Sequence, residues 1–273
     1  MASTSEVGHA KNIANFKELV TYCTGLGTSY APTNAAIALT ALNSAVTNAD
    51  TLEDSVDTAE ELYKSAIGVK QDEFKPLKKF ATRLVNAYIA VNPGKAKIAN
   101  AKSINAKIQG VKLKNPKTPT PTGGTGGTGT GTGTGSSGTG TGPSSTEKTV
   151  GTVIDTPKDI SASQQSYDQM VEHFSKLIVL LAADPLFIPA ETALQVASLN
   201  AKLLALKTSL SNFVIAYTQI TNARIARNHA LYDTNTGICD LAQTTKSYVK
   251  SVFGASSEEY KAIGKIAFKK LKK

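Results

Sequence analysis

The sequence has no tryptophan, only two cysteines and few aromatic residues among its 273 positions. Two cysteines cannot form the disulfide framework that stabilises many small secreted domains. Cys23 and Cys239 also occupy different places in the two halves of the chain, which excludes a cysteine metal site repeated in both halves. Cross-links are therefore not expected to hold the fold together.

Long hydrophobic runs are missing as well. The most apolar run, residues 177–183, ends at Asp184 and Pro185, whereas a membrane-spanning helix needs about 20 apolar residues. The first residues, MASTSEVGHAKN, lack the basic and then apolar pattern of a secretory signal. These absences predict a cytoplasmic protein without a transmembrane segment.

Motifs that carry catalysis or bind cofactors are also absent. There is no GxxxxGK[ST], no GxGxxG that opens a helix and no GxSxG, and neither cysteine has an acid and a base at catalytic spacing. The three histidines, His9, His173 and His229, form no HExxH pair and no recurring ExxH motif, so we interpret them as surface or helix-end residues. The sequence predicts no enzyme, no catalytic residue, no metal ligand and no cofactor.

Residues 116–149 consist almost entirely of threonine, glycine, serine and proline. No charged, aliphatic or aromatic side chain lies between Thr118 and Thr146. Such a segment buries too little apolar surface to offset the entropy of ordering it. We predict a flexible, disordered linker over residues 116–149, which separates a first helical repeat (residues 1–115) from a second (residues 150–273).

Helical periodicity dominates the first half. Apolar residues three and four apart predict a helix over residues 9–26, which Gly25 and Gly27 end. Pro32 is expected to open a second helix of roughly 36 residues, because an apolar stripe runs on from Leu39 with no interruption. A third helix is expected to begin near Asp72 and a Lys-rich fourth to cover residues 95–110.

The second half repeats this order. The apolar residues of its first expected helix match those of the first half one for one: Val171, Phe174, Leu177, Ile178 and Leu181 against Ile13, Phe16, Leu19, Val20 and Cys23. A long heptad stripe follows over residues 196–220. Gly237 and Gly254 then bracket a third helix, and a Lys-rich helix is expected over residues 258–273.

The fold class that follows is all-α: two related antiparallel helical bundles, produced by an internal duplication and joined by the Thr/Gly-rich linker. Each bundle contains one long heptad-patterned helix. We expect the two halves to pack side by side as a pseudo-symmetric pair.

An acidic band runs along the long helix of the first half. It consists of Asp50, Glu53, Asp54, Asp57, Glu60 and Glu61, whose spacing places them on one helix face. The band could attract a cation or a basic partner, or it could be a solvated face, which we favour. The second half has nothing acidic in the corresponding stretch.

Each half ends in a Lys-rich segment. The last one contains Lys265, Lys269, Lys270, Lys272 and Lys273. Lys-rich amphipathic helices can bind phosphate backbones or anionic membrane surfaces, but few arginines or aromatic residues are present to read bases. We favour a solubilising face, or one that pairs with the acidic band of the same or another copy.

Residues 222–232 are the most unusual part of the sequence. They combine two of the few arginines with polar and aromatic side chains, and the candidate contact residues are Arg224, Arg227, Asn228 and Tyr232. Two arginines three apart could clamp a carboxylate or a phosphate. The alternative, which we favour, is an ordinary role at a helix C-terminus.

This stretch, the segment YVKSVFG at residues 248–254 and the closing Lys-rich helix resemble a group of helical proteins of Bacteroidota bacteria. The resemblance covers mainly residues 190–270. It implies an intracellular helical bacterial protein and nothing about mechanism.

The function predicted by these patterns is that of a non-enzymatic structural or protein-interaction protein, which acts through the surfaces of its bundles and binds a protein partner, a further copy of itself included. The alternative is a protein that binds nucleic acid or an anionic surface through its Lys-rich last helices. A membrane-active helical protein is a third alternative, for which residues 177–190 make a poor hairpin because Asp184 and two prolines interrupt them.

Overall fold

The computed structural model describes residues 4–111 and 165–269, and these residues form helices and connecting turns with no strand among them. The elements, in chain order, are α1 (Thr4–Gly25), the short 3-10 helices η1 (Gly27–Ser29) and η2 (Ala35–Ile37), α2 (Leu39–Phe74), α3 (Leu77–Ala90), α4 (Lys95–Gln109), α5 (Tyr167–Ala182), the 3-10 helix η4 (Thr192–Leu194), α6 (Val196–Tyr232), α7 (Ile238–Phe253) and α8 (Glu258–Gly264). The predicted all-helical class is confirmed. The predicted linker, residues 116–149, lies outside the described residues.

The first of the two long helices begins later than the sequence suggested, whereas the second begins at Val196, where its heptad stripe was expected. Pro32 was expected to open the first of them, but residues 30–38 form an extended segment with one 3-10 turn. The Asn34 side chain caps that turn by accepting from the Ala36 amide, and the Tyr30 hydroxyl donates to the Ile37 carbonyl. The side chains of Tyr30 and Ile37 are both buried. They hold the segment outside the helix, which therefore starts at Leu39.

Two further helix ends differ from the prediction. The third helix does not start at Asp72, because α2 continues through that position to Phe74, whose side chain is buried, and α3 begins after Pro76. The last helix ends at Gly264 instead of continuing through the lysines. Residues 265–269 are not helical and lie against other helices, as described below.

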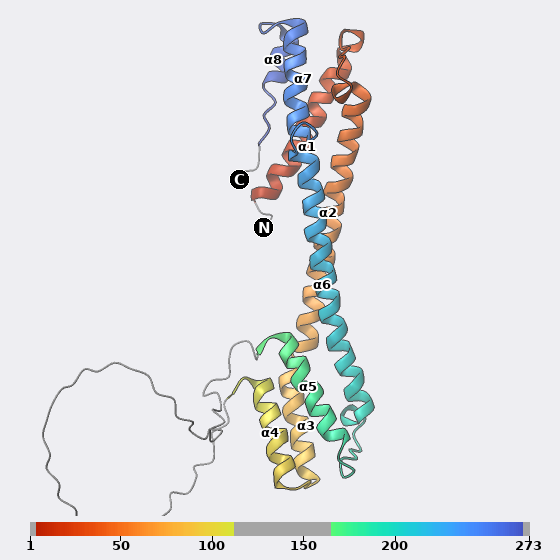
Figure 1. The fold of residues 1–273 in the computed structure, drawn as a ribbon, viewed down its shortest axis with the longest axis vertical. Helices are drawn as coiled ribbons and strands as arrows, with labels where there is room; N and C mark the ends of the chain where they lie inside the picture. The colour runs from red at the N-terminus through yellow and green to blue at the C-terminus, as the bar shows by residue number, and fades with distance from the viewer. Residues whose placement is uncertain (1–3, 112–164, 270–273) are drawn as a thin grey trace, which may run out of the picture. The chain divides into compact units, whose positions relative to one another are not determined.

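The described residues form two compact units, and each unit takes helices from both halves of the sequence. The sequence analysis expected one bundle per half. The first unit contains residues 4–80 and 197–269. Its main core joins α1, the start of α2, α7 and α8 (Figure 1), through buried side chains that include Phe16, Leu19, Leu42, Ile238, Val249 and Ile263.

The second unit contains residues 81–111 and 165–196. Its buried side chains come from α3, α4 and α5 and include Leu84, Tyr88, Ile108, Phe174, Leu177 and Leu181. Asp184, directly after α5, is buried and ties this unit together. Its Oδ2 accepts from the Tyr88 hydroxyl at 2.6 Å and from Lys97 Nζ at 3.0 Å, and its Oδ1 accepts from the Leu186 amide at 3.1 Å.

The same aromatic contact occurs in both units, with the halves exchanged. In the first unit Tyr30, ahead of η2, meets Tyr248 of α7 edge to face, with ring centroids 5.3 Å apart. In the second unit Phe187, ahead of η4, meets Tyr88 of α3 in the same way at 5.7 Å. Each pair therefore joins the turn before one long helix to the helix that follows the other.

The long helices also share buried positions. Leu42 and Leu199 are each the fourth residue of their helix, Ala49 and Leu206 the eleventh, and Ala59 and Ala216 the twenty-first, and all six are buried. Matched positions of this kind are what a common pattern of packing along both helices requires.

Candidate functional site

The long helices α2 and α6 lie side by side and run in opposite directions within the first unit (Figure 1). Contacts along them hold the pair together. The Tyr63 ring lies 5.6 Å from the Phe213 ring and 5.9 Å from that of Tyr217, measured between centroids. Lys70 Nζ lies 3.2 Å from the Phe213 centroid. Burial lowers the pKa of this lysine, because it disfavours the charged form.

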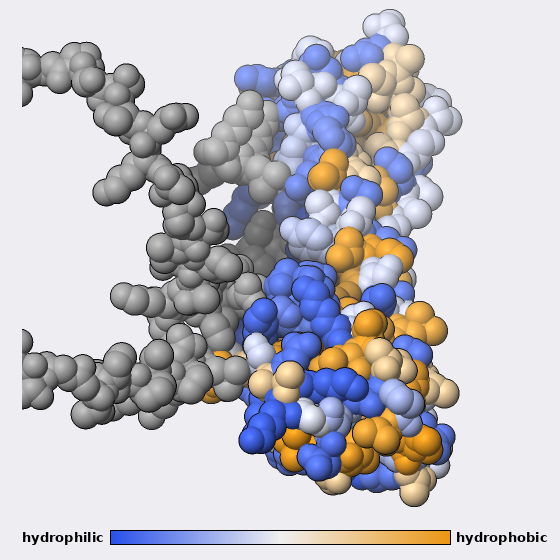
Figure 2. Space-filling view, turned by 60° about the horizontal axis from the view of Figure 1, so that its bottom comes forward, coloured by the Kyte–Doolittle hydropathy of each residue, from blue (hydrophilic) through white to orange (hydrophobic). Residues whose placement is uncertain are grey.

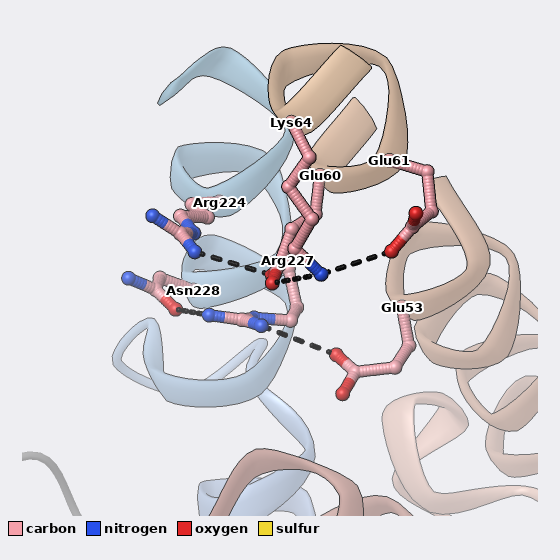
Figure 3. A network of polar contacts seen from close by, with 7 residues as sticks. All are labelled: Glu53, Glu60, Glu61, Lys64, Arg224, Arg227 and Asn228. Carbon is pink, nitrogen blue, oxygen red and sulfur yellow. Dashed lines mark hydrogen bonds and ion pairs between the residues drawn. The ribbon is translucent and has the colours of Figure 1, made fainter. Parts of the chain in front are cut away.

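The arginines of the unusual segment face the acidic band of α2 across this pair (Figure 3). Arg224 Nη2 lies 3.4 Å from Glu60 Oε2, and Arg227 Nη1 lies 3.4 Å from Glu53 Oε2. Arg227 also donates to the Asn228 side chain at 3.4 Å. The two candidate surfaces that the sequence analysis singled out therefore meet each other, and the carboxylates that the arginines contact belong to the same chain.

The two arginine contacts differ in burial. Arg227 is 1% exposed, and the Glu53 side chain retains 20% exposure. The Arg224 and Glu60 side chains retain 43% and 34%. Desolvated charges are costly unless each keeps its partner, whereas exposed pairs contribute little. Of the two arginine contacts, the one between Arg227 and Glu53 is therefore expected to cost more to break.

The remaining members of the acidic band divide between two roles. Asp50 forms an ion pair with Lys17 at 2.7 Å, which joins α2 to α1. Glu61 is exposed and contacts only its helix neighbour Lys64 among the described residues, at 2.9 Å. Asp54 and Asp57 are exposed. The band is thus partly a set of interhelical contacts and partly a solvated face.

A groove follows the α2–α6 pair beside this network. One part, of about 260 Å³, is lined by residues that include Leu62, Val69, Asn212, Ile215 and Gln219, and a second part, of about 550 Å³, shares Leu62 and Gln219 and reaches Asp54. Leu62, Val69 and Ile215 are each about half exposed, at 53%, 51% and 52%. Figure 2 shows hydrophobic patches at the surface on the face that it draws.

The sequence analysis missed this groove. Its apolar lining lies outside the stripes from which the helices were predicted, and single apolar residues on a polar face are common. A usable signal was the presence of Leu62, Val69 and Ile215 beside those stripes, at positions where a helix in a two-helix pair is expected to be polar.

The interpretation of the histidines was correct for one and wrong for two. His229 is exposed near the end of α6 and contacts Asp233 at 2.9 Å. His9 and His173 are buried, at 2% and 4% exposure. His9 Nδ1 lies 2.7 Å from the Tyr232 hydroxyl, so this tyrosine of the candidate site joins α6 to α1. Burial, followed by the charges of two nearby lysines, lowers the pKa of His173.

Three side chains that the sequence analysis did not single out hold residues 265–269 against the first unit. They are Asn12 and Asn15 of α1 and Lys246 of α7. Lys265 and Lys269 of the candidate basic surface are exposed, while Lys270, Lys272 and Lys273 lie outside the described residues. Binding to nucleic acid or an anionic surface through these lysines stays a prediction from the sequence.

Within the described residues, no group of three or more histidine, cysteine or acidic side chains is placed to hold a metal ion. In the same parts of the chain, no helix is both long enough and apolar enough to cross a membrane.

Comparisons with known proteins found no match for this chain: no family model fits it, and neither a curated protein nor a solved structure is significantly similar to it.

Proposed function

We propose that this chain is a non-enzymatic structural or protein-interaction protein, which binds through the α2–α6 groove and takes a second copy of itself as its partner. The observation that carries the proposal is the half-exposed apolar lining of that groove, formed by Leu62, Val69 and Ile215. No described part of the chain covers these side chains. Partly exposed apolar residues in a groove between helices are typical of surfaces that dock another helix.

The size of the lining limits the strength of such an association. Full burial of a leucine, isoleucine or valine contributes about 1.5–3 kcal/mol, so covering three half-exposed side chains contributes about 3 kcal/mol per copy. A two-fold interface buries the set twice and gains about 6 kcal/mol, against an association cost of about 4–15 kcal/mol. This gain lies at the lower end of the cost, so the three side chains alone do not hold a stable dimer. Self-association is therefore expected only at high concentration, and with further contacts beside this lining.

The structure also supports the proposal that the chain arose by duplication. The order of helix, 3-10 turn and long helix recurs on both sides of the linker, and the buried positions of the two long helices coincide. The aromatic contacts of the two units are equivalent with the halves exchanged. A single-repeat ancestor would have needed a second copy to form such contacts, which favours a history of self-association.

The test measures mass in solution over a wide range of concentration, by sedimentation equilibrium or light scattering. The wild type is expected to rise above the monomer mass, and Leu62→Glu is expected to remove the rise because a charge in the groove opposes docking. Val252→Glu on α7 is the matched control, since Val252 has a similar exposure of 50% and lies outside the groove. A wild-type protein that stays monomeric at every concentration would refute the proposal.

A further inference from the structure

Residues 265–269 leave α8 after Gly264 and run as a non-helical segment between α1 and α7. Side chains of the two helices hydrogen-bond to the backbone of this segment. The Asn12 amide makes two such bonds to one residue: Nδ2 donates to the Lys269 carbonyl at 2.8 Å, and Oδ1 accepts from the Lys269 amide at 3.0 Å. Asn12 is 1% exposed, so this pair of bonds is shielded from water.

Two more side chains hold the same segment. Asn15, one turn further along α1, donates from Nδ2 to the Ala267 carbonyl at 2.6 Å. From the opposite side, Lys246 of α7 donates to the Ile266 carbonyl, and its Nζ lies 5.4 Å from the centroid of the Phe268 ring. Donors on two helices therefore bind three backbone carbonyls of the segment.

The side chains of the segment alternate. Ile266 is buried in the core and Phe268 packs partly buried against it, while Ala267 and Lys269 are exposed. This alternation is that of an extended chain with one face on the protein. The groove thus fits an extended peptide that has apolar residues two positions apart. At the other positions it binds the backbone of the peptide and not its side chains.

We propose that the groove between α1 and α7 is a binding site for an extended peptide, and that residues 265–269 of a second copy bind there in exchange for the chain's own. The proposal deepens the proposed function, because it names a segment through which copies associate. We propose this segment as the ligand of the groove because it already lies there in its own chain. An identical segment from another copy would make the same contacts.

When two copies exchange residues 265–269, each contact of the groove is replaced by an identical one. The free-energy cost of the exchange is therefore that of bringing two copies together. The chain's own segment has an effective concentration in the millimolar range, as expected for a short tether. The own segment therefore dominates at low protein concentration, and the exchanged form grows as the concentration approaches about 1 mM. A trapping experiment is suited to such a minor population.

The experiment uses the full-length chain with single cysteines at the contact between Asn15 and Ala267. Asn15→Cys and Ala267→Cys are made separately and mixed, and diamide, which is reduced as it oxidises two thiols to one disulfide, is added at protein concentrations from about 10 µM to about 1 mM. A covalent dimer that contains one chain of each variant is expected, in an amount that rises with concentration. Cys23 and Cys239 are buried, and burial raises the pKa of Cys23 to about 11, so background reaction is small.

Two controls make the result decisive. The double variant Asn15→Cys/Ala267→Cys must form a disulfide within one chain, which verifies that the segment lies in the groove. A mixture of Thr21→Cys, an exposed position almost two turns further along α1, with Ala267→Cys must give no dimer above that of each variant alone. A peptide with the sequence of residues 264–269 must reduce the dimer, and a scrambled peptide must not.

Failure of the double variant to cross-link would overturn the site. An intrachain cross-link without a mixed dimer at any concentration would overturn the exchange. The α2–α6 proposal is tested separately: the mixed dimer should survive Leu62→Glu, and self-association through the α2–α6 groove should survive Asn12→Leu. Loss of one behaviour without the other shows which of the two proposals is wrong.

Discussion

Neutralising Glu53 is predicted to destabilise the protein more than any other single change in its charged network. Glu53→Gln keeps the shape of the side chain and removes the carboxylate that lies 3.4 Å from Arg227. Arg227 is 1% exposed and cannot regain its hydration in the folded state. Removing one partner of a fully buried pair costs about 3–5 kcal/mol, and because the Glu53 side chain keeps 20% exposure we expect about 2–3 kcal/mol.

The free energy of unfolding is measured by urea denaturation, followed by far-ultraviolet circular dichroism. The expected change is a lower midpoint at an unchanged denaturant slope, since the surface exposed on unfolding stays the same. Glu61→Gln is the matched control, because the Glu61 side chain is 75% exposed and pairs with Lys64. Exposed pairs of this kind contribute about 0.2–1 kcal/mol.

A second variant separates the buried charge from the packing. Glu53→Gln combined with Arg227→Met removes both charges and keeps a long apolar side chain in the space of the arginine. Because replacing a whole buried pair is often neutral or stabilising, the double variant should recover most of the loss. Equal destabilisation by Glu53→Gln and Glu61→Gln would refute the reasoning, and so would a double variant that is no more stable than Glu53→Gln alone.

The remaining predictions concern pH and thiol reactivity. Burial lowers the pKa of His173 in the folded state, so the unfolded chain binds the proton more readily and stability should fall as the pH drops below about 6.5; His173→Gln should lack this slope in denaturation curves. The Tyr88 hydroxyl and then Lys97 lower the pKa of Asp184, so Asp184→Asn should be less stable than wild type at neutral pH, and the difference should close as the pH falls below about 3.9 towards the folded pKa. Burial raises the pKa of Cys23 to about 11, so this thiol should react with a thiol reagent at neutral pH only after denaturant is added, and a fast reaction of the native protein would contradict its burial.

Local patterns in the sequence predicted the local structure well. The long helix of the first half was expected to begin at Pro32 and to have roughly 36 residues. The helix exists and α2 has 36 residues, but it runs from Leu39 to Phe74, so its length was predicted and its two ends were not. Gly237 and Gly254 lie where expected, directly before and directly after α7, and Gly254 has a positive φ that favours glycine. Periodicity and helix-ending glycines act over a few residues, so a single sequence is enough to reveal them.

Contacts between distant residues could not be predicted in this way. The arginines of residues 222–232 and the acidic band of α2 were both recognised as unusual, but nothing in the spacing says that Arg227 meets Glu53. The closing Lys-rich segment was predicted as helix because its local pattern is helical. It is extended at residues 265–269 because Asn12, Asn15 and Lys246 offer its backbone hydrogen bonds that a helix would forgo.

The expectation of one bundle per half overlooked a consequence of the helix length that the same analysis had obtained. A helix of 36 residues is about 54 Å long, whereas the helices that follow it in the same half, with 14 and 15 residues, reach only about 22 Å. Such short helices cannot cover it along its length, and α1 of the same half packs against its start, so the rest of its apolar stripe is left for helices of the other half to cover. The other long helix, laid alongside in the opposite direction, supplies contacts that one half lacks, such as those of Phe213 and Tyr217 with Tyr63. Because α2 and α6 are both this long, the pairing of helices from the two halves follows from their length.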